Sequence, residues 1–361
     1  MIPIHAVDDV AQDKPHLAEV HADHLFLAFP GGQYQHSGPS NPMTWSGLLG
    51  AEAFAVGDEI TGLKSTAGGV LLVTCRNKIL GLYGASSTDW AQKVLSEAIG
   101  IQIDTLQNTF VPVGLSDRGL VRIDRVQEFG DFALNLLDQR KLFAPIIEQD
   151  EWQCSTQVAA SNQLRLFSVR GDNVAITLQA DGTPMATTFR YASRVIGCWR
   201  YDEHEERVFF ALDGQPGMVF ELDEESCSFD GEPISWRLRL PFAHCGSPSL
   251  VKSWVSAIFE QTTPIPVEVD VRWSVDHMLG SQFSSRRQGA VIGEDRSAIW
   301  NESRWNQFYW SGGNTSSREP IDLTGSSTSI SMAIGGASDR AINFTLTGLT
   351  INYFPRRARR D

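Results

Sequence analysis

The chain has 361 residues, 42% of them hydrophobic and 20% charged, and a formal net charge of −13 at pH 7. This length and composition are typical of a globular protein with a substantial core, organised either as two domains or as one large all-β domain with an appendage. The acidic balance repels phosphate backbones, which argues against the wrapping of nucleic acid as the main function.

The cysteines are scattered, odd in number and never spaced C-x-x-C: Cys75, Cys154, Cys198, Cys227 and Cys245. This pattern predicts buried free thiols rather than a disulfide framework or a zinc site, and it fits folding in a reducing cytosol. The N-terminus has neither the basic region nor the apolar run of a secretion signal. No window is apolar over the length that a membrane span requires, so we expect none.

Short β-strands are predicted along almost the whole chain, from residues 24–29 to residues 343–354. The segments are rich in Val, Ile, Phe and Thr, and Gly, Pro, Asn and Asp interrupt them. Only residues 87–100 and 130–147 carry patterns that predict short helices. The expected fold class is therefore all-β.

Residues 70–84, with the sequence VLLVTCRNKILGLYG, place a cysteine beside two cations between two apolar runs. A catalytic thiol needs a positioned base, and no histidine lies between His36 and His204. The alternative is a β-hairpin whose polar tip is Arg76–Lys78. We expect the hairpin, with Cys75 as a structural residue.

A loose repeat of strand, turn and strand runs through four groups, near residues 59–84, 101–126, 152–180 and 193–222. Its spacing of roughly 40 residues is the period of a four-stranded propeller blade. After Pro241 the strands lengthen, and those at 250–276 and 328–354 predict a β-sandwich. We therefore expect a β-propeller-like domain over 1–240. A β-sandwich-like domain would follow over 241–361, with an aromatic-rich insert at 280–320 and a basic C-terminal tail.

Two kinds of polar cluster have residue types that could carry chemistry. His16, His21 and His24 lie close in sequence, but a strand would point the last two rings to opposite faces, so packing or surface roles are favoured over zinc. The acids of 202–207 and 221–226 favour solvated turns over a glycosidase pair. Nucleotide-binding, zinc-protease and serine-hydrolase motifs are absent from the sequence. We assign no catalytic, cofactor-binding or metal-binding residue and expect a non-enzyme.

Two segments are candidate interfaces. The insert carries large aromatic side chains in a Gly/Ser/Asn-rich setting, which act either as a clamp onto the sandwich or as interface anchors: Trp300, Trp305, Tyr309 and Trp310. The tail carries a cluster of arginines that favours docking onto a neighbour's carboxylates over contact with DNA: Arg356, Arg357, Arg359 and Arg360.

Several segments together resemble the β-propeller tail proteins of tailed bacteriophages, which are called tail hub, nozzle or tail tubular B proteins. The similar segments are HLFLAF, SGPSNPMTW, VGDEITGLKSTAGGVLLVTCRNKILGLYG, GLSDRGLVRIDRVQEFGDF, and the two stretches at 227–242 and 246–254. None of these motifs is specific to the family by itself, but their order and spacing along the chain are. The resemblance covers roughly residues 17–276.

The resemblance implies a mechanical role in the virion tail. Family members form a ring, commonly a hexamer, through which DNA passes during ejection, and portal, adaptor, fibre or other tail proteins attach to it. An acidic lumen would let DNA slide without binding. The alternative function is a propeller protein that binds or cleaves host surface glycans, with Trp300, Trp305 and Trp310 stacking on sugar rings.

Overall fold

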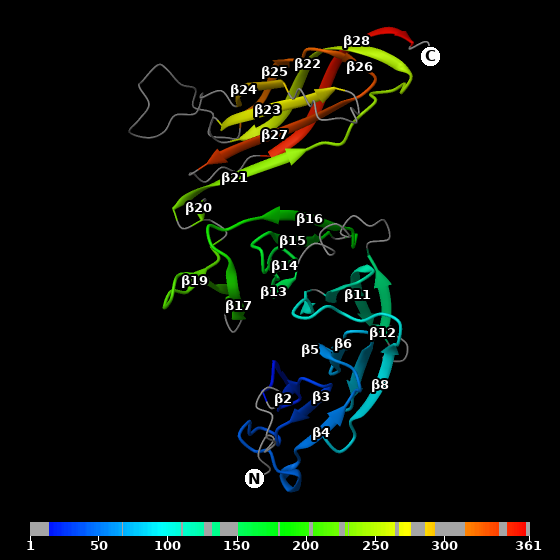
Figure 1. Ribbon diagram of the computed structural model, residues 1–361, viewed down its shortest axis with the longest axis vertical. Coiled ribbons are helices and arrows are strands. Elements are labelled where there is room, and N and C mark those ends of the chain that lie inside the picture. Colours follow the sequence, from blue (N-terminus) through cyan, green and yellow to red (C-terminus); the bar gives the residue numbers. More distant parts are fainter. Residues whose placement is uncertain are drawn as a thin grey trace. The chain divides into compact units, whose positions relative to one another are not determined.

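The computed structural model consists almost entirely of antiparallel β-sheets (Figure 1). It describes residues 14–66, 68–109, 111–125, 132–137, 151–179, 181–201, 205–223, 228–229, 231–263, 267–275, 286–292, 315–338 and 345–358. Within these residues the regular elements are strands, apart from the single 3-10 turn η1 (Gly47–Leu49). The predicted all-β class is confirmed. The chain divides into two compact units, Met1–Leu222 and Asp223–Asp361.

The first unit contains five consecutive sheets, and each sheet is built from strands that follow one another in the chain. The first sheet is β1 (Leu17–His21), β2 (His24–Phe29), β3 (Gln33–His36) and β4 (Glu52–Ala55). The second is β5 (Ile60–Ser65), β6 (Leu71–Cys75), β7 (Ile79–Tyr83) and β8 (Ala91–Ser96). The third is β9 (Gln107–Asn108), β10 (Pro112–Ser116), β11 (Gly119–Arg125) and β12 (Phe132–Leu136).

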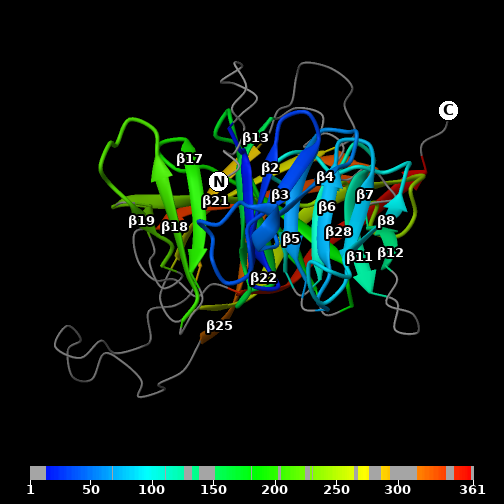
Figure 2. The same cartoon turned by 90° about the horizontal axis from the view of Figure 1, so that it is seen from below.

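The fourth and fifth sheets continue the series. The fourth is β13 (Trp152–Val158), β14 (Gln163–Ser168), β15 (Asn173–Leu178) and β16 (Pro184–Phe189). The fifth is β17 (Val195–Tyr201), β18 (Arg207–Leu212) and β19 (Phe220–Glu221), and it has three strands where the others have four. Figure 2 shows sheets of this unit from below, with the first in blue and the fifth in green. The predicted repeat is therefore present, and the first sheet extends it toward the N-terminus.

Each pair of consecutive sheets in the first unit shares a hydrophobic core. Phe26 of β2 packs with Leu71 of β6, and Leu72 of β6 packs with Val121 of β11. The third and fourth sheets share a cluster, as do the fourth and fifth. The strands β1 and β5, β9 and β13, and β13 and β17 contact each other. Sheets that pack face to face around a series of contacting first strands make the unit propeller-like.

The amino-acid sequence of strand β6 reflects this packing of sheets on both of its faces. All five of its residues are buried. Successive side chains of a strand point to opposite faces, so a strand with a core on both sides has no polar face. Leu71 and Val73 enter the core shared with the first sheet, and Leu72 enters the core shared with the third.

The two predicted helices are wrong where the structure describes them. Residues 91–96 form the outer strand β8, which pairs with β7 with Gln92 opposite Leu82. The polar residues before it make a turn in which the Asp89 carboxylate accepts the backbone N–H groups of Ala85 and Ser86, at 3.2 and 2.8 Å. Pairing with β7 outweighs the helix propensity of Ala, Gln, Lys and Leu. Residues 132–136 likewise form β12, paired with β11.

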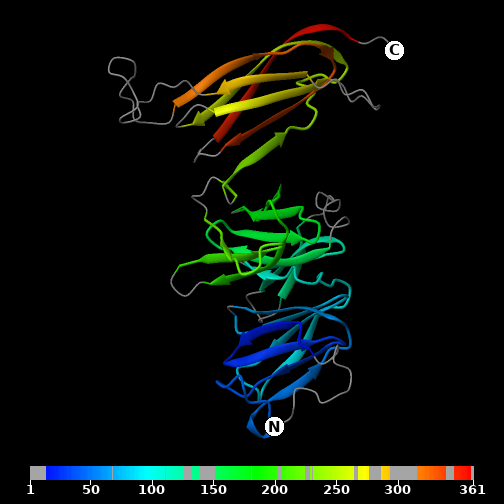
Figure 3. The same ribbon diagram turned by 60° about the vertical axis from the view of Figure 1, so that its left-hand side comes forward.

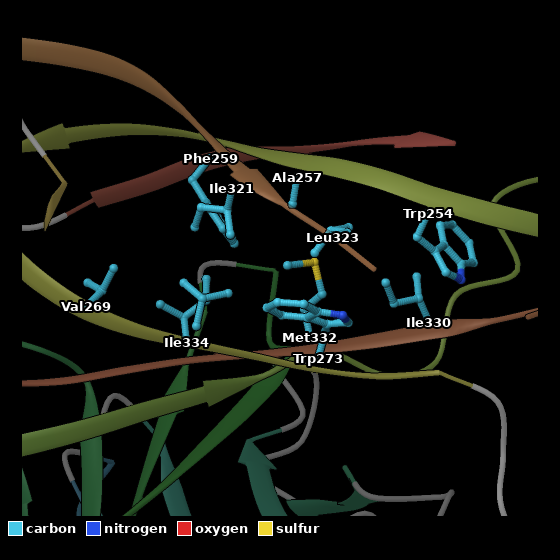
Figure 4. Close-up of a cluster of buried hydrophobic side chains, with 11 residues drawn as sticks. Trp254, Ala257, Phe259, Val269, Trp273, Ile321, Leu323, Ile330, Met332 and Ile334 are labelled. Atoms are coloured by element: carbon cyan, nitrogen blue, oxygen red, sulfur yellow. The ribbon is translucent and has the colours of Figure 1, made fainter. Parts of the chain in front are cut away.

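The second unit is a β-sandwich, as predicted (Figure 3). One sheet has the order β20 (Ser228–Phe229), β21 (Glu232–Arg239), β27 (Ile330–Ser338), β23 (Val267–Val275) and β24 (Arg286–Ile292). The other contains β25 (Thr315–Asp322), β22 (Leu250–Thr263) and β26 (Ser326–Ser327), with β28 (Thr345–Ala358) paired to β22. In Figure 4 side chains of the two sheets point toward each other, for example Phe259 and Ile321 toward Trp273 and Ile334.

The expected boundary at residue 240 differs from the division seen in the structure. Strand β21 pairs with β27 along its length, with Trp236 opposite Gly336. It therefore belongs to the second unit, although its sequence precedes Pro241. The change in strand length on which the expected boundary was based marks the start of β22 inside the sandwich.

Candidate functional site

The Cys75 hairpin is a structural element, as expected. Strands β6 and β7 pair with Thr74 opposite Ile79, and the Cys75 backbone N–H donates to the Lys78 carbonyl at 2.8 Å. The Cys75 side chain is fully buried. Burial, with a smaller contribution from Asp58 and against the influence of Lys78, raises the pKa of the thiol to about 12. A thiol with this pKa is almost wholly protonated at neutral pH and is a poor nucleophile.

The polar tip of the hairpin is held from two sides. Asp58 accepts hydrogen bonds from the backbone N–H and the side-chain amide of Asn77, at 2.9 and 3.2 Å. On the other side, a Cβ at Gly100 would lie only 1.9 Å from the Arg76 carbonyl oxygen. Only glycine allows the chain to pass this close to the tip. The residues that looked reactive in the sequence therefore tie the second sheet to its neighbouring segments.

Three histidines lie together in the first sheet, and one of them was not singled out from the sequence. Ala22 and Asp23 have positive φ angles of 45° and 63°, so β1 and β2 join through a two-residue turn that places His21 directly opposite His24. The expectation that their rings point to opposite faces is wrong. The alternation argument holds within one strand, whereas His21 ends β1 and His24 begins β2.

The His24 and His36 rings both approach the Ser37 carbonyl oxygen through Nδ1, at 2.6 and 2.9 Å. Trp90 covers both rings, at centroid distances of 4.9 and 4.6 Å. His21 contacts the Ser65 hydroxyl through Nδ1 at 2.8 Å. Among the described residues no group of His, Cys, Asp or Glu has an arrangement suited to a metal ion. His16 contacts the Ile60 carbonyl instead.

Two nitrogens in this histidine cluster, His21 Nε2 and His36 Nε2, are buried without a hydrogen-bond partner. Burial and the neighbouring His24 lower the pKa of His21. Burial also lowers the pKa of His36, with a contribution from His24 in the same direction, while the Ser37 carbonyl and Glu52 act against it. Both rings are therefore held in the neutral form.

Two acids of the predicted clusters, Glu206 and Glu221, form ion pairs, with Arg200 and Arg207 respectively. The Glu206 carboxylate accepts the backbone N–H groups of Ala159 and Ala160, at 2.7 and 2.8 Å, and pairs with Arg200 at 2.6 Å. Burial acts against ionisation of Glu206, but these hydrogen bonds outweigh it and lower its pKa. Glu206 thus fastens the fourth sheet to the fifth rather than lying free in a turn. Residues 202–204 and 224–226 lie outside the described residues.

The predicted interface residues are described only in part. Trp300, Trp305, Tyr309, Trp310, Arg359 and Arg360 lie outside the described residues. Arg356 and Arg357 belong to strand β28, and Arg356 is exposed. These assignments remain predictions.

A fully buried lysine in the second unit was not predicted. Lys252 Nζ donates to the carbonyl oxygens of Ser247, Leu250 and Thr328, at 2.7, 3.1 and 3.4 Å. The ammonium group also lies 5.7 Å from the Tyr353 ring centroid. The sequence held a signal for this burial, because Lys252 and the core residue Trp254 occupy alternate positions of one strand.

The sandwich carries a surface cavity of about 280 Å³ over β21, β27 and β23. Its lining includes Trp236 and Arg237 together with Asp270 and Arg272, which pair with each other at 2.9 Å. The lining therefore combines an aromatic ring with charged groups.

No helix among the described residues is long and apolar enough to cross a membrane.

Exposed apolar side chains of the first unit gather on its two end sheets. The first-sheet apolar surface comprises Val20 of β1 and three residues of the β3–β4 loop, Met43, Leu48 and Leu49. The fifth-sheet apolar surface comprises Ile196, Trp199 and Tyr201 of β17 with Met218 and Val219 of the β18–β19 loop. Exposed apolar side chains of this size occur at protein interfaces where they form one contiguous patch.

Comparison with known proteins yields a distant structural likeness. No family model matches the chain, and no curated protein matches it. Among solved structures it is similar to the β-propeller domain of Cps50 (Swd1) from Myceliophteria thermophila. The two share 11% sequence identity and a TM-score of 0.35, over 57% of this chain and 70% of that one. A likeness at this level carries no argument about function, and the description of the fold rests on the sheets themselves.

Proposed function

We propose that the chain is a non-enzymatic structural subunit of a bacteriophage tail, of the tail hub or nozzle type, which assembles into a ring around the path of the DNA. The observation that carries the proposal is the position of the family-like segments. HLFLAF forms β2, residues 56–84 contain β5 to β7, and residues 114–125 contain the end of β10 and all of β11. The later segments contain β21 and the start of β22. The resemblance therefore concerns the residues that build the scaffold.

The packing of that scaffold suits a mechanical role. Consecutive sheets of the first unit share four cores, so a strand such as β6 is buried on both faces. A close-packed interior has low compressibility and transmits strain. Sheets linked in this way resist deformation when neighbouring proteins pull on them.

The charge supports the same function. The net charge of −13 belongs to the whole chain, and a ring would multiply it by its copy number. A lumen formed by acidic subunits repels phosphate groups, so DNA moves through it without being retained. The ring, its expected hexameric state and its attachment to portal, adaptor or fibre proteins follow from the resemblance.

The direct test is deletion of the gene from the phage genome, followed by cryo-electron microscopy of the particles. We expect particles that lack a ring of density in the tail, and complementation with the Cys75→Ser variant should restore it because Cys75 has only a packing role. Deletion particles with complete tails would refute the proposal. Shortening of host polysaccharide by the purified chain would instead favour a glycan-cleaving function.

A further inference from the structure

Two cysteines of the first unit lie on neighbouring strands of two different sheets. Cys154 belongs to β13 and Cys198 to β17, the first strands of the fourth and fifth sheets, and these strands contact each other. Cys154 lies opposite Phe167, and Cys198 lies opposite Phe210. Opposite residues of an antiparallel pair share a face. Both cysteines therefore point to the core between the fourth and fifth sheets, which contains the two phenylalanines.

The two thiol groups meet in that core. Both cysteine side chains pack against the same hydrophobic cluster, and a hydrogen bond joins the thiols of Cys154 and Cys198. Both residues are free thiols in the structure and are half-buried, whereas Cys75 is fully buried. A small oxidant therefore reaches this thiol pair more easily than it reaches Cys75.

We propose that Cys154 and Cys198 are an oxidisable pair, which a peroxide converts into a disulfide bond between the fourth and fifth sheets. A disulfide requires side chains that approach each other from facing positions. The contact between β13 and β17 and the hydrogen bond between the thiols meet this requirement. The reduced pair is the form that the structure holds.

The oxidation proceeds in two balanced steps. The thiolate of one cysteine attacks an oxygen of hydrogen peroxide, the O–O bond breaks, and the products are a sulfenic acid and, after uptake of a proton, water. The second thiol attacks the sulfenic sulfur, so that the S–S bond forms and the hydroxyl group leaves as water with the proton of that thiol. Both thiols are oxidised, and the peroxide is reduced to water.

The surroundings of the pair make this reaction depend on pH. The hydrogen bond with Cys154 and burial are the main causes that raise the pKa of Cys198. The charges of Asp104 and of an ionised Cys154 act in the same direction, and Lys64 acts against them. Because the thiolate is the reacting form, disulfide formation should become faster as the pH rises from about 7 to about 9.

The bond would fasten the fifth sheet to the fourth. The present contacts between these sheets are the shared core and the hydrogen bonds from the Ala159 and Ala160 N–H groups to the Glu206 carboxylate. Noncovalent contacts of this kind open when a part of the structure unfolds locally. A disulfide closes the chain from β13 to β17 into a loop, and such a cross-link stabilises the fold by restricting the unfolded chain.

Peptide mapping of the full-length chain tests the pair directly. The chain is treated with hydrogen peroxide, the remaining thiols are alkylated, and unreduced peptides are identified by mass spectrometry. We expect peptides joined through Cys154 and Cys198, which dithiothreitol separates. The link should be lost in Cys154→Ser and in Cys198→Ser and kept in Cys245→Ser, a change at a half-buried cysteine of the second unit. In each single variant of the pair, the remaining cysteine should stop at a sulfenic acid that dimedone labels.

The outcomes that contradict the pair are equally direct. Free thiols at both positions, under conditions that oxidise free cysteine completely, overturn the inference. A link from either residue to another cysteine of the chain also overturns it. Mapping of the wild type needs no variant, so a substitution that prevents folding leaves this test intact.

Stability and hydrogen exchange provide the second measurement. We expect the thermal transition of the first unit to lie about 5 °C or more higher in the oxidised than in the reduced wild type. The backbone amides of β17 and β18 should exchange more slowly after oxidation, and dithiothreitol should reverse both effects. Peroxide should produce neither effect in Cys198→Ser. A disulfide that forms without slowing exchange in these strands overturns the fastening of the fifth sheet.

Discussion

At the scale of single residues, both units bury polar groups that the fold must compensate. Lys252 is fully buried, and three backbone carbonyl oxygens replace the water around its ammonium group. His21 and His36 are buried with one nitrogen each left without a partner. The lysine must remain hydrogen-bonded, and the two histidines remain buried at low cost only while they are neutral.

The histidine cluster should make the first unit sensitive to acid. The pKa values of His21 and His36 are lowered in the folded chain, whereas in the unfolded chain they return to the ordinary value of 6.5. Below that pH the unfolded chain therefore binds more protons, and the free energy of unfolding falls as pH falls. Denaturant unfolding followed between about pH 7.5 and about pH 5 measures this loss.

The variant His36→Phe keeps a ring in the core but removes one titrating group. We expect a smaller loss of stability on acidification than in the wild type, while His244→Gln, an exposed control in the second unit, should leave the loss unchanged. The groups that act on the pKa of His36 are the Ser37 carbonyl, His24 and Glu52, and all three remain in the variant. An equal loss in His36→Phe and wild type would contradict this origin of the acid sensitivity.

At the scale of elements, a strand of the first unit is defined by how many of its faces are buried. Strand β6 has cores on both sides and contains no exposed residue, whereas the outer strand β8 has four exposed residues out of six. The two strands belong to one sheet, so their substitutions can be compared directly.

The substitution Leu72→Asp places a carboxylate in the core shared by the second and third sheets. We expect it to lower the free energy of unfolding by about 4 kcal/mol or more, because the apolar residues of this core cannot replace the water that a carboxylate loses. The matched change Val94→Asp on β8 removes an exposed apolar residue and should cost less than about 1 kcal/mol. Similar costs for the two variants, measured by denaturant unfolding, would contradict the two-sided burial of β6.

At the scale of the whole molecule, each unit has cores of its own. The four clusters of the first unit lie within residues 26–212, and the sandwich cluster lies within residues 254–334. Cooperative unfolding follows from shared packing, so two units with separate cores unfold as two transitions.

A variant of Lys252 tests this division. Lys252→Met removes the ammonium donor from three carbonyl oxygens and should lower the stability of the second unit by about 2–4 kcal/mol. In a calorimetric scan we expect one transition to move down while the other stays in place. Arg239→Met, an exposed control on β21, should move neither. A single transition that shifts as a whole would contradict independent cores.

The interactions that lie close in the chain were predictable from the sequence. Apolar segments of strand length predicted the all-β class, the repeat of sheets and the sandwich. The polar tip after Cys75 predicted a hairpin. Each of these features depends on side-chain periodicity and on turn residues within a few positions of one another. The phage-tail function and the interface residues of the insert and tail rest on the resemblance and on residue type, and they stay predictions.

Features that depend on distant partners were decided by the tertiary structure alone. Residues 91–96 have helix-forming side chains, but the free edge of β7 makes them a strand. His21 and His24 face the same way because a two-residue turn separates them, and His36 joins them from β3. The Trp199 and Phe209 rings stack because the pairing of β17 with β18 places the two residues opposite each other. Sequence periodicity determines which faces are apolar, whereas only the assembled sheets determine which of those faces find a partner.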